Sequence, residues 1–196
     1  MQEAYSSTVL AASILKAAWL PALAWGEDTL DDYITLADGR SLAVRPVEPR
    51  DAAGEQAFVA GLSASARFRR FHFGLTQLPE SLLHAFTHAD QKTHVALVAE
   101  DEADSHRIVA DARYVVDGDT RSAEFAIAVS DAWQGNGLGR RLMQKLLAHA
   151  RSSGIKRLFG DVLADNAPML ALMSRLGADL EPNPEDDSLV RASFAL

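Results

Sequence analysis

The chain has 196 residues, of which 48% are hydrophobic, and its formal net charge at neutral pH is −8. This length and composition indicate one globular domain that is long enough to bury a core. The acidic balance argues against general binding of nucleic acids or anionic membranes, because both are polyanions. The chain contains no cysteine, which excludes disulfides and thiolate chemistry, and we expect a cytoplasmic protein.

An apolar run, VLAASILKAAWLPALAW, occupies residues 9–25. Glu3 precedes the run without any Lys or Arg, and Lys16 interrupts it, so it lacks the pattern of a signal peptide. The run is also too short and too interrupted to span a bilayer. We predict that residues 1–37 form an N-terminal helical extension. The alternatives left open are a contact in a homodimer and a segment that never orders.

The first half of the remaining chain mixes strand and helix signals. Residues 31–40 predict a short strand and a turn, and residues 41–47 predict a strand that ends at prolines. A helix is expected from Pro49 to about Leu62, where proline suits the first turn. Ser63 is a candidate cap for a second helix, and residues 79–90 predict a third helical stretch.

From residue 93 onward the hydrophobic pattern changes to a period of two residues, which is typical of strands. Further strands are expected over 93–100, 107–116, 122–130, 155–163 and 188–196, with helices over 137–152 and 166–177. A meander of strands followed by alternating helix and strand predicts an α/β (α+β) domain around one sheet.

The stretch QGNGLGRR, residues 134–141, places glycines at every second position between a predicted strand and a long helix. Such glycines allow a sharp turn and leave backbone N–H groups open as an anion nest. Two arginines beside a helix N-terminus are unfavourable unless an anion is present. The pattern fits neither a dinucleotide fingerprint nor a P-loop. We hypothesise that the turn holds a diphosphate flanked by Arg140 and Arg141; the alternative is a glycine-rich turn without a ligand.

One carboxylate stands out in the strand predicted over 122–130. Glu124 shares a face with Ala126 and Ala128, whereas the large apolar residues between them face the other side. Small neighbours leave space for a substrate beside this carboxylate. Glu124 is therefore a candidate general base, and the alternative is a solvated glutamate without a role.

Gln134, Gly137 and Gly139 form a QxxGxG pattern that resembles the signature of the GNAT superfamily of N-acetyltransferases. The stretch DNAPMLALMSRLGA resembles the second motif of that family, and LAVRPVEPRDA resembles its common opening. The resemblance covers residues 38–196 and implies a GNAT domain with a mixed, mostly antiparallel central sheet flanked by helices. LSASARFRRF and the strand around Glu124 are more narrowly similar to the catalytic domain of bacterial protein lysine acetyltransferases.

This resemblance implies direct transfer of an acetyl group from acetyl-CoA to a primary amine, without a metal. Protein lysine is the leading acceptor; a small amine, or a CoA-binding regulatory module with little catalysis, is the alternative. The resemblance agrees with Glu124 as general base. It also implies that acetyl-CoA is bound by a set of residues along the strand, the glycine turn and the second motif: Ile127, Ala128, Val129, Gln134, Gly135, Asn136, Gly137, Leu138, Gly139, Arg140 and Asn166.

One group that many family members use is missing. A tyrosine in the second motif often protonates the departing CoA thiolate, and the matching position here is Met173. The lysine acetyltransferase type also lacks this tyrosine. The thiolate is expected to leave unassisted or through water; the alternative is that another group protonates it.

Overall fold

A computed structural model describes residues 30, 32–72, 74–104, 107–118 and 120–196. The helix predicted from the apolar run over 9–25 lies outside the described residues. Strand β1 (Asp32–Thr35) precedes residue 38, where the domain was expected to start, and pairs with β2 (Ser41–Pro46). Within the described part of the chain, no helix is long and apolar enough to cross a membrane.

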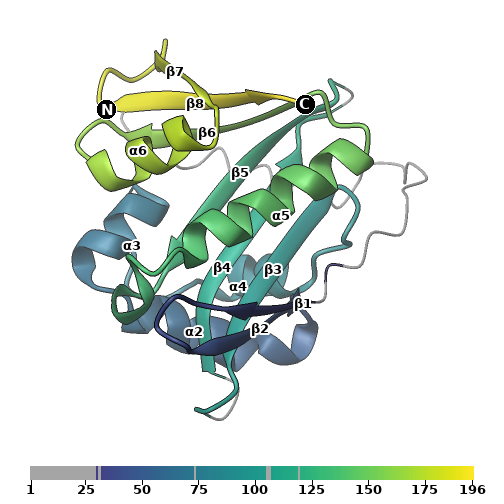
Figure 1. Cartoon of the computed structure of the whole chain (residues 1–196), viewed down its shortest axis with the longest axis vertical. Coiled ribbons are helices and arrows are strands. Elements are labelled where there is room, and N and C mark those ends of the chain that lie inside the picture. The colour runs from purple at the N-terminus through teal and green to yellow at the C-terminus, as the bar shows by residue number, and fades with distance from the viewer. Residues whose placement is uncertain (1–29, 31, 73, 105–106, 119) are drawn as a thin grey trace.

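The centre of the fold is an eight-stranded sheet in the order β1-β2-β3-β4-β5-β6-β8-β7 (Figure 1). Its other strands are β3 (His94–Asp101), β4 (Arg107–Val116), β5 (Ser122–Val129), β6 (Arg157–Leu163), β7 (Asp179–Pro182) and β8 (Leu189–Ala195). Neighbouring strands run antiparallel except for β5 and β6, which are parallel. The predicted mixed, mostly antiparallel sheet is therefore confirmed.

Helices cover both faces of this sheet (Figure 1). One face carries α2 (Ala52–Gly61), α3 (Ala64–Phe71) and α4 (Glu80–Thr87), and the other carries α5 (Leu138–Ser152) and α6 (Ala167–Arg175). All five were expected, although the helix predicted from Pro49 begins as a separate 3₁₀ turn, Pro49–Asp51. Ser63 caps α3 as predicted, because its hydroxyl accepts a hydrogen bond from the N–H of Ala66 at 3.1 Å.

The two faces of β5 differ as its alternating sequence predicted. Phe125, Ile127 and Val129 pack in the core under α5 and α6, whereas Ala126 and Ala128 pack against the core under α2, α3 and α4. Glu124 therefore lies on the face toward α3.

Strand β7 was not predicted. Its four residues are all exposed, so its sequence shows no alternation between buried and exposed positions. The strand exists because it pairs with β8 at the edge of the sheet.

Candidate active site

The parallel strands β5 and β6 pair only at their beginnings. Their register runs from Ser122 opposite Arg157 to Glu124 opposite Phe159, and the pairing ends there. The next residue of β6, Gly160, has no room for a side chain, because a Cβ atom would lie 2.8 Å from the carbonyl oxygen of Phe125. Beyond this point the strands separate, and a pocket of about 600 Å³ lies between them.

The pocket reaches both faces of the sheet. On one side it is lined by residues of α3 and α4, and on the other by the glycine turn and α6. The lining residues that carry the argument below are Arg69, Arg70, His72, Glu124, Ala126, Ile127, Ala128, Val129, Gln134, Gly135, Gly137, Gly139, Arg140, Asp161 and Asn166.

Backbone groups of β5 point into this opening. The N–H of Asp117 donates to the carbonyl of Ser122 at 2.8 Å, and the N–H of Ser130 donates to that of Val109 at 2.9 Å. An antiparallel ladder uses alternate residues, so the even-numbered residues of β5 bond to β4. The N–H groups of Ile127 and Val129 consequently face away from β4, toward the pocket.

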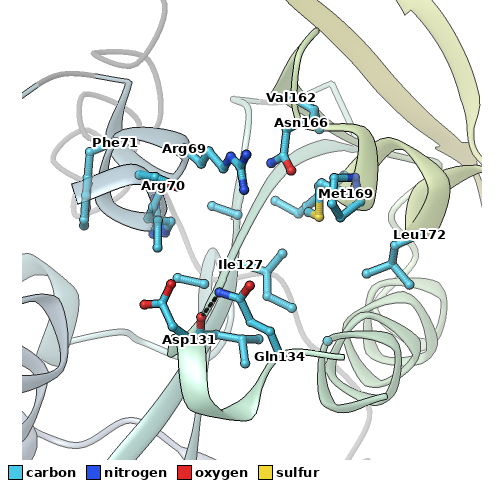
Figure 2. Close-up of a pocket in the computed structure, with 18 of the residues that line it drawn as sticks. Arg69, Arg70, Phe71, Ile127, Asp131, Gln134, Val162, Asn166, Met169 and Leu172 are labelled. Carbon is cyan, nitrogen blue, oxygen red and sulfur yellow. Dashed lines mark hydrogen bonds between the residues drawn. The ribbon is translucent and has the colours of Figure 1, made fainter. Parts of the chain in front are cut away.

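The backbone N–H and C=O groups of Ala128 face β4 instead, because they belong to the ladder with that strand. Only the methyl group of Ala128 is left to line the pocket. The end of β5 is fixed by Gln134, whose side-chain amide donates to the carbonyl of Val129 at 2.9 Å (Figure 2). The first residue of the QxxGxG pattern thus ties the glycine turn to the strand.

The glycine turn presents a helix N-terminus to the pocket. Gly135 and Gly137 have φ angles of 77° and 87°, in the left-handed region that glycine adopts without strain. The N-cap of α5 is Gly137, which has no side chain that could accept a hydrogen bond from the start of the helix. The first N–H groups of a helix also have no partner within the helix. These groups form the site that an anion would occupy.

Not every residue predicted in the turn reaches the pocket. Gly135, Gly137, Gly139 and Arg140 line it, whereas Asn136 and Leu138 do not. The side chain of Leu138 is 1% exposed and packs in the core, so only its backbone remains available to a ligand.

The two arginines of the turn diverge. Arg140 lines the pocket, but Arg141 lies in a separate groove between β1 and α5. The hypothesis that both arginines flank one diphosphate is therefore corrected to Arg140 alone. The chain turns along the helix between them, so adjacent side chains point in different directions.

Asn166 precedes α6 and caps it without a side-chain hydrogen bond. In Figure 2, Asn166 and Arg69 point into the pocket from opposite walls, one from the start of α6 and the other from α3. Among the described residues, the side chain of Asn166 makes no capping hydrogen bond to α6, so it is available to a ligand in the pocket.

Glu124 lies at the closed end of the opening, where β5 and β6 still pair. Its side chain is 8% exposed, and burial together with Asp161 raises its pKa to about 7, against the opposing effects of Arg191 and Arg70. Asp161 itself accepts two hydrogen bonds from Arg191, both at 2.9 Å. A carboxyl group with this pKa exchanges protons readily near neutral pH.

A model of the acetyltransferase (GNAT) family matches residues 64–178, which include α3, β5, the glycine turn and α6. The chain belongs to the GNAT family. It is accordingly an acetyltransferase that uses acetyl-CoA as co-substrate. The open nest at α5 and the backbone N–H groups of β5 fit the diphosphate and the amide-bearing chain of this molecule.

Relatives of this GNAT enzyme include an acetyltransferase of Pseudomonas aeruginosa, 30% identical over 83% of this chain and 88% of the relative. The acetyltransferase Pat of Mycolicibacterium smegmatis is 32% identical over 74% of this chain, which spans only 43% of that longer protein. The crystal structure of the GNAT domain of S. lividans PAT is similar with a TM-score of 0.78 and 28% identity, covering 85% of this chain and 97% of that one.

No tyrosine lines the pocket of this GNAT enzyme within the described residues. Tyr114 is fully buried, and its hydroxyl lies 2.7 Å from Nδ1 of His149, whereas Tyr33 is 68% exposed on β1. Met173 is 0% exposed in the core. Within the same part of the chain, no cluster of three His, Asp or Glu side chains is arranged to hold a metal.

Sequence reasoning missed part of the wall near Glu124. Arg70 lies in the stretch LSASARFRRF, which carried part of the resemblance, but it was not singled out as a site residue; its side chain is only 6% exposed. Asp161 and Arg191 were not singled out either. They meet because β6 and β8 are paired in a register that places them opposite each other, which no local pattern encodes.

Proposed function

We propose that this GNAT enzyme acetylates the side-chain amine of protein lysines, with Glu124 as the general base. The observation that carries the proposal is the position of Glu124: a buried carboxyl group with a pKa near 7, beside two alanines, in the wall of the pocket. The relation to Pat of Mycolicibacterium smegmatis and to the PAT domain supports an enzyme of that type.

The acceptor makes a base necessary. A lysine side chain has an ordinary pKa of about 10.4, so only about one in a thousand or fewer is neutral at pH 7. In the proposed reaction Glu124 removes one proton from the ammonium group, directly or through water. The neutral amine then attacks the thioester carbonyl; the C–N bond forms, the C–S bond breaks and CoA departs as a thiolate. The second proton on the nitrogen passes to that thiolate, directly or through water, which leaves the amide and the CoA thiol as products.

The remaining groups hold acetyl-CoA and the developing charge. We assign the diphosphate to the nest formed by the glycine turn, with Arg140 at its side. The N–H groups of Ile127 and Val129 face the opening and are suited to receive the amide groups of the cofactor and the oxyanion. Asn166 contacts acetyl-CoA from the opposite wall. A thiolate is weakly basic, so its departure does not require a tyrosine.

Other predictions remain open beside this one. We retain a cytoplasmic location, a contact between two copies through residues 1–37 and a GNAT domain over 38–196 as expectations. A small-molecule amine is the second candidate acceptor.

The test uses acetyl-labelled acetyl-CoA and a desalted bacterial lysate, with the small molecules added back in a parallel reaction. We expect label on protein lysines, and a loss of about 100-fold or more in the Glu124→Gln variant while acetyl-CoA still binds. Glu102→Gln, at an exposed hairpin, is the matched control and should retain full turnover. Label confined to small molecules would favour the second candidate. Binding of acetyl-CoA without any transfer would indicate a regulatory module.

A further inference from the structure

A cluster of buried charges lies behind α3, on the side of the sheet that Glu124 faces. Glu55 from α2 and Arg113 from β4 have side chains that are 0% exposed, and Asp111 of β4 is 2% exposed. Arg113 donates to Asp111 from Nε at 3.0 Å, approaches Glu55 to 3.4 Å and stacks over the ring of Phe86 at 3.7 Å. Charges this deeply buried must be balanced among themselves or by a neighbour.

The cluster is not balanced internally. Burial and the neighbouring Asp111 raise the pKa of Glu55 well above its usual range, which favours its neutral form. His94, which lies 3.2 Å from Arg113, is also neutral, because burial and Arg113 lower its pKa to about 3. With Glu55 in its neutral form, two guanidinium groups, Arg113 and Arg70, face the single carboxylate of Asp111, and one positive charge is left over.

Arg70 presents that extra charge to the pocket. Its Nη2 atom lies 3.5 Å from Oδ1 of Asp111, is buried and has no hydrogen-bond partner among the described residues. Its guanidinium lies over the rings of Phe71 and Phe86, at 5.0 and 5.5 Å, and the side chain lines the same pocket as Glu124 (Figure 2). Burial lowers the pKa of Arg70 and Asp111 opposes this, yet a guanidinium stays charged at neutral pH.

We propose that Arg70 is a positioning residue for Glu124: its buried guanidinium supplies the positive charge that keeps the Glu124 carboxylate in its proton-accepting form. The inference rests on the proposed role of Glu124 as the base. Arg70 acts through Glu124, and the cluster of Glu55, Asp111 and Arg113 holds it in place.

The other charges around Glu124 do not replace Arg70. Asp161 on β6 and Asp117 in the turn between β4 and β5 disfavour ionisation of Glu124, and Arg191 on β8 favours it. Arg191, however, forms two hydrogen bonds with Asp161, so their charges largely cancel. His72, at the end of α3, is kept neutral because burial and Arg70 lower its pKa. Arg70 shares the carboxylate of Asp111 with Arg113, so its charge is only partly compensated.

The test measures the ionisation of Glu124 directly, by ¹³C NMR titration of glutamate carboxyl groups in the full chain. The signal of Glu124 is assigned by its loss in Glu124→Gln. We expect a midpoint near pH 7 in the wild type. In Arg70→Gln and Arg70→Met the midpoint should rise by about one pH unit. The acid limb of kcat/KM should move by the same amount, lowering kcat/KM about tenfold at pH values below the midpoint.

Two further variants are matched controls. Arg70→Lys retains the charge and should titrate close to the wild type. Arg107→Gln removes an arginine whose side chain is 57% exposed and pairs with Asp104 at the surface, so its midpoint should not change.

An unchanged Glu124 midpoint in a folded Arg70→Gln protein would overturn the proposal. Failure of both neutral variants to fold, with Arg70→Lys folded, would also overturn it, because the charge would then serve the buried cluster. The NMR titration does not depend on turnover. Full activity in Glu124→Gln would instead remove the proposed base and leave the measured coupling between Arg70 and Glu124 intact.

Discussion

Glu124 is held by the fold in an environment that opposes its charge. Its side chain is 8% exposed, and burial raises its pKa from 4.5 to about 7. The same burial that makes this carboxyl group a suitable base at neutral pH makes the ionised form costly for the folded protein. Activity and stability are therefore expected to conflict at this residue.

We predict that Glu124→Gln stabilises the protein at pH 8. The folded-state pKa is raised, so the stabilising contribution of Glu124 is fully present below pH 4.5 and is lost as the pH rises through about 7. Glutamine imitates the protonated form at every pH. The gain in the free energy of unfolding at pH 8 should reach at most about 3 kcal/mol.

Urea denaturation of both proteins at pH 5 and pH 8 checks this prediction. The difference should be small at pH 5, where the wild-type carboxyl group is protonated in the folded state. Titrations of other buried groups are common to both proteins and cancel in the comparison. A difference that does not depend on pH would show that packing, not ionisation, distinguishes the two side chains.

At the scale of elements, the pocket exists because β5 and β6 part after Glu124, and Gly160 lies at that point. A Cβ atom there would lie 2.8 Å from the carbonyl oxygen of Phe125 and 2.9 Å from its ring. We predict that Gly160→Ala lowers the free energy of unfolding by about 1–3 kcal/mol, because backbone and ring must both shift. Thermal and urea denaturation measure the loss.

Gly61→Ala is the matched control for Gly160. Gly61 ends α2 and does not have a positive φ angle, and a Cβ atom added to it would meet only open space. Alanine favours helix over glycine by up to about 1 kcal/mol, so this variant should be as stable as the wild type or more so. Equal stability of the two variants would mean that the strands tolerate a side chain where they part.

The glycine turn provides a second prediction at this scale. Arg140→Glu should weaken acetyl-CoA binding by about tenfold or more, because a carboxylate would replace a cation beside the diphosphate. Its melting temperature without ligand should remain near that of the wild type, since Arg140 is exposed. Arg141→Glu is the control, because Arg141 lines a different groove and should leave affinity unchanged. Calorimetric titration with acetyl-CoA distinguishes the two arginines.

Local patterns predicted the elements well and the surroundings of the site poorly. Alternation identified β5 and its two faces, and the QxxGxG pattern located the turn that lines the pocket. Strand β7 was not predicted, because its residues are uniformly exposed and show no alternation. The burial of Arg70 beside Asp111 depends on how α3 packs on β4, and the pairing of Asp161 with Arg191 depends on strand register. Such contacts arise from tertiary structure, which a local pattern does not specify.

At the scale of the whole molecule, a second, partly buried ion-pair network ties one layer of helices to the sheet. Arg45 of β2 donates two hydrogen bonds to Asp51, at 2.8 and 2.7 Å, and also bonds to Glu100 of β3. Asp51 ends the 3₁₀ turn from which α2 begins, and α2 carries Glu55 into the cluster behind the pocket. Loss of this network should therefore lower the free energy of unfolding of the entire domain.

We predict that Arg45→Met lowers the free energy of unfolding at pH 7 by about 3–5 kcal/mol, because two buried carboxylates would lose their cation. Burial raises the pKa of Asp51, but Arg45 and the N–H of Glu48 together bring it below its ordinary value. The stabilisation is thus present above pH 3.8 and is lost as the pH falls through the lowered pKa. The cost of Arg45→Met should shrink in acid as the carboxyl groups become protonated.

Arg107→Met is the control, since its ion pair with Asp104 is more than half exposed and should contribute at most about 1 kcal/mol. Urea denaturation at pH 7 and at about pH 2.5 compares the two variants with the wild type. Equal losses would show that Arg45 contributes no more than a surface pair. A large loss at pH 7 that declines at about pH 2.5 would assign the anchoring of α2, and with it the support of the pocket wall, to Arg45.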